Sequence, residues 1–199
     1  METRNIAVAL DKAKEYNFKK ITTFEKACET LGLHYEYMAK ITKLVAADSK
    51  ASAAMFKLNI VRKALNLGYG LHLTKAPENS HIYYPSNVFI KEDSNRFKNS
   101  LNSGRIEVIG KIINEGTLYK VLSGDSTNAG TVGLGSFSSN VCYTDANIGF
   151  FGCATKEIAA HFGKYFGMLI TEAKYADMVD FEIMEDKYGN TEFSSANCC

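Results

Sequence analysis

The chain has 199 residues, of which 46% are hydrophobic and 23% are charged, and its formal net charge is +1. This composition supplies one ordinary core and excludes wholesale disorder. No apolar run reaches the roughly 18 residues that span a bilayer, and the N-terminus lacks the apolar stretch of a signal peptide, so we expect a soluble protein that is neither membrane-bound nor secreted.

The charge is unevenly distributed along the chain. Residues 1–75 carry 13 Lys or Arg against 7 Asp or Glu, a net +6, whereas residues 76–199 carry 10 against 15, a net −5. Two oppositely charged lobes that attract each other explain this asymmetry. A basic lobe facing nucleic acid is the alternative, which we favour less because the charges do not cluster and arginine, the better phosphate ligand, is scarce.

Residues 1–75 are predicted to form a basic, helical region. Apolar residues at helical spacing predict helices over residues 4–16, 24–31, 35–47 and about 49–65. A capping box of Thr22 and Glu25 would begin the second helix, and Asp48 or Ser49 would begin the fourth unless the third simply continues. Helix-turn-helix is one interpretation, but no candidate recognition helix is rich in Arg, Asn or Gln, which favours a plain bundle.

Residues 76–199 are predicted to form an α+β domain. β-branched and aromatic residues predict strands over residues 81–85, with 87–90 as their continuation, then 105–114, 117–123, 146–153 and 178–184. The third and fourth of these would form a hairpin around Glu115 and Gly116. The polar stretch 91–104 is expected to be a loop.

A run rich in Gly, Ser and Asn occupies residues 123–147 and leads into an amphipathic helix. Thr155 is a good N-cap, and a sustained apolar stripe predicts a helix over residues 156–175 that packs on the sheet. We expect the run to be irregular, and an irregular segment of this length is often functional. Its composition is typical of adaptable binding loops, although an ordinary surface loop is the alternative. The predicted contact residues are Tyr83, Asp125, Asn140, Tyr143 and Asn147.

The sequence contains no signature of a catalytic, metal or cofactor site. The five cysteines form no C-x-x-C pair, the four histidines are scattered, and no Lys-Ser/Thr pair follows the glycines of residues 130–135. Asp125 and Asp145 could offer oxygens to Ca²⁺, but solvated turn residues are the favoured interpretation. An enzyme would need a deep pocket that gathers residues such as His161, Asp145 and Cys142. We therefore expect no cofactor and no metal.

Three segments carry a resemblance to a known group of proteins. They are ITTFEKACETLGL, FKLNIVRKALNLGYG followed by HIYYPSN, and IGFFGCATKEIAAHFGKYFGMLI. Together they resemble an uncharacterised family encoded by phages and prophages of gut anaerobes, whose members end in a similar helix. The matching positions of that helix are Thr155, Glu157, Ala159, Gly163, Lys164 and Phe166. The family carries no activity to transfer, so the resemblance implies a phage origin and a location in the host cytoplasm or the virion.

A second resemblance is local. Residues 121–126, the polar run and residues 147–150 are similar to the closing segment of C-type-lectin-like domains of the formylglycine-enzyme type and of variable proteins diversified by phage retroelements. In those domains V-L-x-G-G-S and I-G-F-R motifs frame a displayed binding surface. This chain has Asp125 where Gly is expected, Phe151 where Arg is expected, and no Trp.

These observations combine into one expectation. The fold should be α+β, with a helical N-terminal region, a small, mostly antiparallel sheet and a long C-terminal helix packed on it. The function should be that of a non-catalytic, phage-encoded binding or virion-associated structural protein that contacts its partner through residues 123–147. The partner would be a protein or glycan ligand or other virion subunits, self-association included. The alternative is a nucleic-acid-binding or regulatory protein that acts through the basic region.

Overall fold

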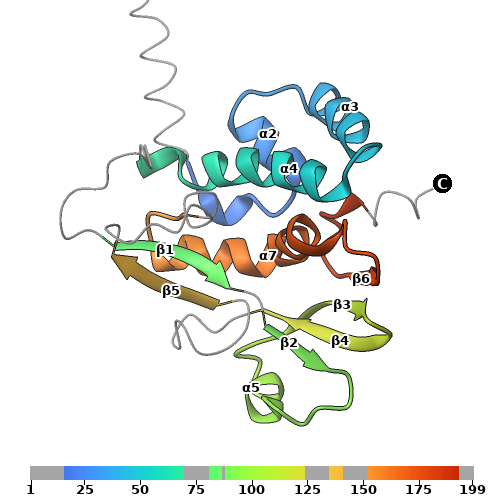
Figure 1. The fold of residues 1–199 in the computed structure, drawn as a ribbon. Coiled ribbons are helices and arrows are strands. Elements are labelled where there is room, and N and C mark those ends of the chain that lie inside the picture. The colour runs from blue at the N-terminus through green and yellow to red at the C-terminus, as the bar shows by residue number, and fades with distance from the viewer. Residues whose placement is uncertain (1–15, 70–80, 87, 124–134, 141–151, 193–199) are drawn as a thin grey trace, which may run out of the picture.

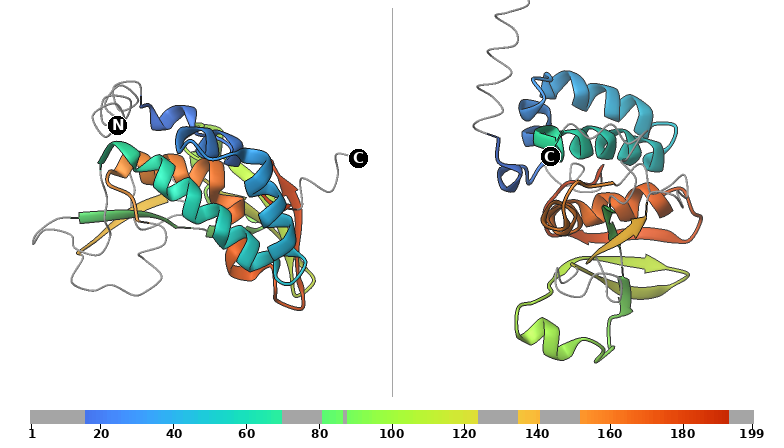
Figure 2. Two further views of the ribbon diagram at one scale, coloured as in Figure 1. Left: turned by 90° about the horizontal axis from the view of Figure 1, so that it is seen from above. Right: turned by 90° about the vertical axis from the view of Figure 1, so that its left-hand side faces the viewer.

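The computed structural model describes residues 16–69, 81–86, 88–123, 135–140 and 152–192, and it has the expected α+β fold (Figure 1). The N-terminal helices form one layer, the long helix α7 (Lys156–Tyr175) lies beneath them, and β-strands lie on the far side of α7 (Figure 2). The predicted helix 4–16 and strand 146–153 fall largely outside the described residues.

The N-terminal layer consists of α2 (Phe24–Thr30), α3 (Tyr35–Ala46) and α4 (Lys50–Leu65), with short 3₁₀ turns η1 (Phe18–Lys20) and η2 (Leu67–Tyr69). Ser49 caps α4, because its side chain accepts a hydrogen bond from the Ser52 amide. The capping box predicted at Thr22 is wrong by one residue. Thr23 has the extended backbone of an N-cap, and its hydroxyl accepts from the Lys26 amide, so the helix begins one residue later than the box requires.

The described strands form two antiparallel sheets. The larger has the order β2 (Val88–Lys91), β4 (Thr117–Leu122), β3 (Val108–Asn114), β6 (Phe181–Asp186). The predicted hairpin is confirmed as β3–β4, and both residues of its turn have positive φ, 50° at Glu115 and 71° at Gly116. Two such residues in succession are typical of the tight turns that match strand twist.

Two predictions about irregular segments are corrected by the structure. Within the polar run, residues Gly135–Asn140 form strand β5, which pairs antiparallel with β1 (His81–Ser86). The run is therefore not irregular throughout. The predicted loop 91–104 contains a short helix, α5 (Lys98–Asn102). It begins directly after Phe97, whose backbone is left-handed.

Helix α7 is the central element of the fold. The Thr155 hydroxyl accepts from the Ile158 amide and begins the helix where predicted. One side of α7 completes the core of the helical layer with Ile158, Ala159, Phe162, Phe166, Leu169 and Ile170. Met168 packs instead with Ile109, Ile112, Val121 and Ile183 of the larger sheet. The helix thus packs on the sheet, as predicted, and also on the N-terminal helices. None of the described helices has the length and apolar character needed to cross a bilayer.

Candidate binding cleft

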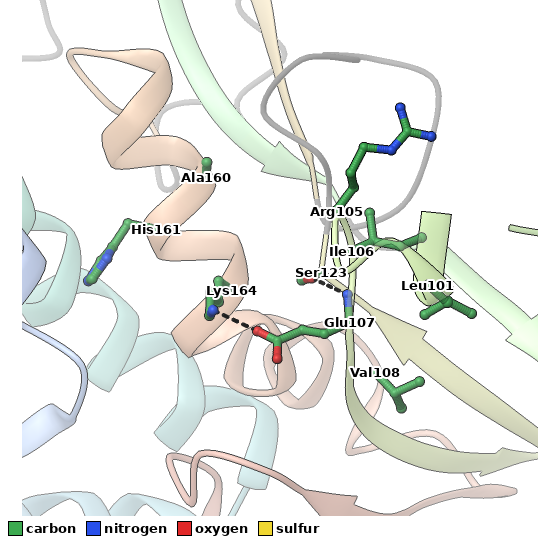
Figure 3. A pocket seen from close by; sticks show the side chains of 10 residues that line it. Leu101, Arg105, Ile106, Glu107, Val108, Ser123, Ala160, His161 and Lys164 are labelled. Atoms are coloured by element: carbon green, nitrogen blue, oxygen red, sulfur yellow. Dashed lines mark hydrogen bonds and ion pairs between the residues drawn. The ribbon is translucent and has the colours of Figure 1, made fainter. Parts of the chain in front are cut away.

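A cleft of about 550 Å³ lies between the N-terminal half of α7 and the chain that leads from α5 into β3 (Figure 3). Helix α7 contributes Ala160, His161 and Lys164 to one wall. The opposite wall carries Arg105 and Glu107, together with three apolar side chains, Leu101, Ile106 and Val108. Ser123, the first residue of the polar run, also lines the cleft. We call this site the α7–β3 cleft.

The backbone of the β3 wall is fixed by local hydrogen bonds. Gly104 has a φ of 69°, a left-handed conformation that lets the chain leave α5 and turn back along the sheet. The amides of Arg105 and Ile106 then donate to the Ser100 carbonyl at 3.1 and 3.3 Å. These contacts hold the wall to the end of α5.

Two further bonds lock Glu107 to the end of β4. The Ser123 amide donates to the Glu107 carbonyl at 2.8 Å, and the Glu107 amide donates to the Ser123 hydroxyl oxygen, also at 2.8 Å. Because Ser123 is only 4% exposed, these bonds are shielded from water. The start of the polar run and the charged wall of the cleft are therefore one rigid unit.

Glu107 is the electrostatic centre of the cleft. Its Oε1 accepts from Lys164 Nζ at 2.8 Å and from the Tyr188 hydroxyl at 2.7 Å, and its Oε2 accepts from Lys187 Nζ. Burial alone would raise the pKa of Glu107, but the bonds from Lys164, Lys187 and Tyr188 outweigh burial and lower it to about 2. Glu107 is consequently anionic at neutral pH and joins α7, β3 and the turn after β6.

His161 is turned away from the interior of the cleft, although its residue lines the wall (Figure 3). Its Nε2 lies 2.8 Å from the Ile21 carbonyl oxygen, and its ring packs against Phe18 and Tyr165 at centroid distances of 5.5 and 4.6 Å. Burial lowers the pKa of His161, which favours the neutral ring with Nε2–H as donor. This histidine ties α7 to the segment before α2.

Arg105 adds a second positive charge to the lining of the cleft, besides Lys164. Its side chain is exposed, and its Nη2 donates to Ser100 Oγ at 3.1 Å, while the guanidinium carries five N–H donors in all. Figure 3 shows it extended at the edge of the cleft. Lys164 on the facing wall and Lys187 both pair with Glu107, so two cations share one carboxylate.

The residues predicted as contacts are only partly described. Tyr83 lies in β1 and pairs with Ser138, and Asn140 lies in β5 and pairs with His81, so both belong to the same two-stranded ribbon. Asp125, Tyr143 and Asn147 lie outside the described residues, as do Asp145 and Cys142, which an enzyme was expected to combine with His161.

The charged residues of the cleft were not predicted from the sequence. Glu107 interrupts the apolar pair Ile106 and Val108, a local signal that this strand end has a polar contact. Lys164 was noted only as a position of the family resemblance. No sequence spacing joins Glu107 to Lys187 and Tyr188, which lie about 80 residues further along the chain.

The buried thiols are poor candidates for chemistry. Burial raises the pKa of Cys28 to about 11 and also raises the pKa of Cys153, so both stay protonated at neutral pH. Among the described residues, no three His, Cys, Asp or Glu side chains are grouped so that they could hold a metal ion.

Comparisons with protein-family models, curated proteins and solved structures give no match. A function must therefore be inferred from the geometry of the chain itself.

Proposed function

We propose that this chain is a non-catalytic, phage-encoded binding protein that contacts its partner through the polar segment 123–147 and the α7–β3 cleft at which that segment begins. One observation carries the proposal. The polar segment is anchored to the scaffold at two described places: Ser123 is locked into the cleft wall, and Gly135–Asn140 is a strand paired with β1 beside α7. A segment with binding-loop composition is thus supported by a rigid frame.

The titratable groups around the cleft support binding rather than catalysis. Glu107 is held by three donors and His161 by a backbone carbonyl, so each is committed to joining elements of the fold. A general acid or base needs a pKa near the working pH and access to the substrate. The pKa of Glu107, about 2, is far from neutral pH, and the imidazole of His161 faces the N-terminal layer.

The partner is a protein or glycan ligand or another subunit of the virion, and the protein acts in the virion or in the host cytoplasm. The experiment uses immobilised full-length chain, an extract of infected cells, a glycan array and disrupted phage particles. The test variant replaces Asn140, Tyr143 and Asn147 with Ala. The control variant replaces three residues exposed on α3, Glu36, Tyr37 and Lys40, with Ala.

We expect the wild type and the control to retain the same partner and the test variant to lose it, with all three proteins melting at similar temperatures. Retention by the test variant would contradict the proposal. Detection of the chain in purified virions by mass spectrometry would assign it to the particle. A labelled DNA duplex tests the alternative function. DNA binding that falls steeply with added salt would favour a nucleic-acid-binding protein that acts through the basic N-terminal region.

A further inference from the structure

Among the described residues, the charges in and around the α7–β3 cleft do not cancel. Lys164 and Lys187 share the single carboxylate of Glu107, so this trio keeps one net positive charge. Arg105 adds a second positive charge at the edge of the cleft, where its side chain is exposed. Because the walls exclude part of the solvent, charges of one sign in a cleft attract ions of the opposite sign more strongly than they would on an open surface.

Each wall of the cleft offers a donor that suits a carboxylate. The guanidinium of Arg105 presents a fork of N–H groups that fits both oxygens of a carboxylate, and one of its nitrogens is already oriented by Ser100 Oγ. Lys164 lies on the α7 wall and is 42% exposed, so its ammonium group is accessible to a ligand as well as to Glu107. An acidic segment that crosses the cleft can therefore place one carboxylate on Arg105 and another on Lys164.

The sheet side of the cleft is apolar. Leu101, Ile106 and Val108 lie along it and belong to a small core that continues beneath with Ile90 and Leu122. An apolar side chain next to the bound anion would cover this surface and strengthen the charged contact by excluding water.

We infer that the α7–β3 cleft binds an acidic segment of a protein partner, with separate Asp or Glu carboxylates on Arg105 and on Lys164 and a neighbouring apolar side chain against Leu101 and Val108. This inference rests on the proposed function and names the class of its ligand. A peptide fits better than a nucleic acid or an acidic glycan, because sites for single strands stack successive bases on aromatic side chains, and sugars also pack on aromatic faces. No Phe, Tyr or Trp lines the described cleft.

The test measures binding of a fluorescein-labelled peptide with alternating Glu and Leu, using fluorescence anisotropy and the full-length protein. A control peptide has Gln in place of each Glu. Arg105→Gln removes the guanidinium fork, and Arg96→Gln is the matched control, because Arg96 is also exposed but lies outside the cleft. Ala160→Glu is a second variant that places a negative charge in the α7 wall. Circular dichroism shows whether each variant is folded.

We expect the Glu peptide to bind the wild type and Arg96→Gln equally. Its affinity should fall roughly tenfold in Arg105→Gln, the effect of losing one hydrogen bond between charged groups. It should also fall in Ala160→Glu, and the Gln peptide should bind at least tenfold more weakly than the Glu peptide. Equal affinities for Arg105→Gln and the wild type, or for the two peptides, would overturn the inference.

Two further probes decide between ligand classes. Oligogalacturonate and a single-stranded oligothymidylate are measured under the same conditions, and Arg105-dependent binding of either one in place of the peptide would overturn the peptide assignment. Loss of the natural partner by the Asn140, Tyr143 and Asn147 variant, with no binding of the Glu peptide, would refute this inference alone and leave the proposed function intact.

Discussion

Replacement of Glu107 by Gln should destabilise the protein at neutral pH and alter its acid unfolding. The substitution keeps the shape of the side chain but removes the charge that holds Lys164, Lys187 and the Tyr188 hydroxyl. The two ammonium groups would then face each other across a neutral amide, which can accept hydrogen bonds through only one of its two polar atoms.

The size of the effect follows from the pKa of Glu107. A fall from an ordinary 4.5 to about 2 would be worth about 3 kcal/mol of unfolding free energy if it were fully expressed. Lys164 and Lys187 are 42% and 45% exposed, so water screens part of the attraction, and we expect a loss of about 1–2 kcal/mol at pH 7. Because the folded pKa lies below the unfolded one, this stabilisation is complete above pH 4.5 and is lost as the pH falls from 4.5 towards 2.

Urea unfolding, followed by circular dichroism at pH 7, 4.5 and 2.5, measures the unfolding free energy of the wild type and of Glu107→Gln. The control is Glu185→Gln, because the Glu185 carboxylate is 54% exposed and lies 3.8 Å from Lys111, a pair that should be worth less than about 0.5 kcal/mol. The difference in unfolding free energy between the wild type and Glu107→Gln should become smaller as the pH falls. A gap of less than 0.5 kcal/mol at pH 7, or one that stays constant to pH 2.5, would refute the reasoning.

Two other substitutions test the packing around α7. Burial raises the pKa of Glu172 to about 7, so the unfolding free energy should decline as the pH rises from 4.5 through 7. Glu172→Gln should abolish that decline and stabilise the protein by about 2–3 kcal/mol at pH 9, as measured by urea unfolding. Gly110→Ala should cost about 3 kcal/mol in the same assay, because the new Cβ would collide with the Glu185 carbonyl and with Met168, whose Cε would lie 2.8 Å away. A wild type equally stable at pH 5 and pH 9, or a loss below 1 kcal/mol for Gly110→Ala, would contradict these expectations.

The parts of the fold that the sequence predicts are those fixed by nearby residues. Helices α3, α4 and α7 have apolar positions at helical spacing and end at or next to the predicted residues. Caps such as Ser49 and Thr155 lie within three residues of the amides that they bind. The β3–β4 hairpin is equally local, since two residues with positive φ turn the chain.

The missed elements depend on distant residues. Strand β5 has the composition of a loop, and it becomes a strand because β1, some 50 residues earlier, offers its backbone hydrogen-bonding edge. Helix α5 is one turn long, too short to show an apolar period, and it is held by Phe97 and Leu101 packing near Ile106. In both cases tertiary contacts decide the conformation that local propensity leaves open.

The candidate cleft shows the same limit, since its charged residues come from three separate parts of the chain. Glu107 follows α5, Lys164 lies midway along α7, and Lys187 follows β6. The sequence did predict that the polar run has a firm strand before it, and Ser123 is indeed the residue at which that run meets the cleft. The charges that define the site could be assigned only once the elements were placed together.

Apart from Lys164, the groups whose bonds shape the α7–β3 cleft are distinct from the groups that would contact a ligand. Glu107 is fixed by Ser123 through its backbone and by α7 through its carboxylate, whereas His161 holds α7 to Ile21 on the side away from the cleft. The walls are therefore in position before a ligand arrives, so binding costs little ordering of the protein. Stability and affinity should then separate: Arg105→Gln should weaken peptide binding while leaving the unfolding free energy unchanged. Glu107→Gln should reduce the unfolding free energy without weakening peptide binding, because the backbone bonds to Ser123 keep the wall in place and the loss of a carboxylate makes the cleft more positive.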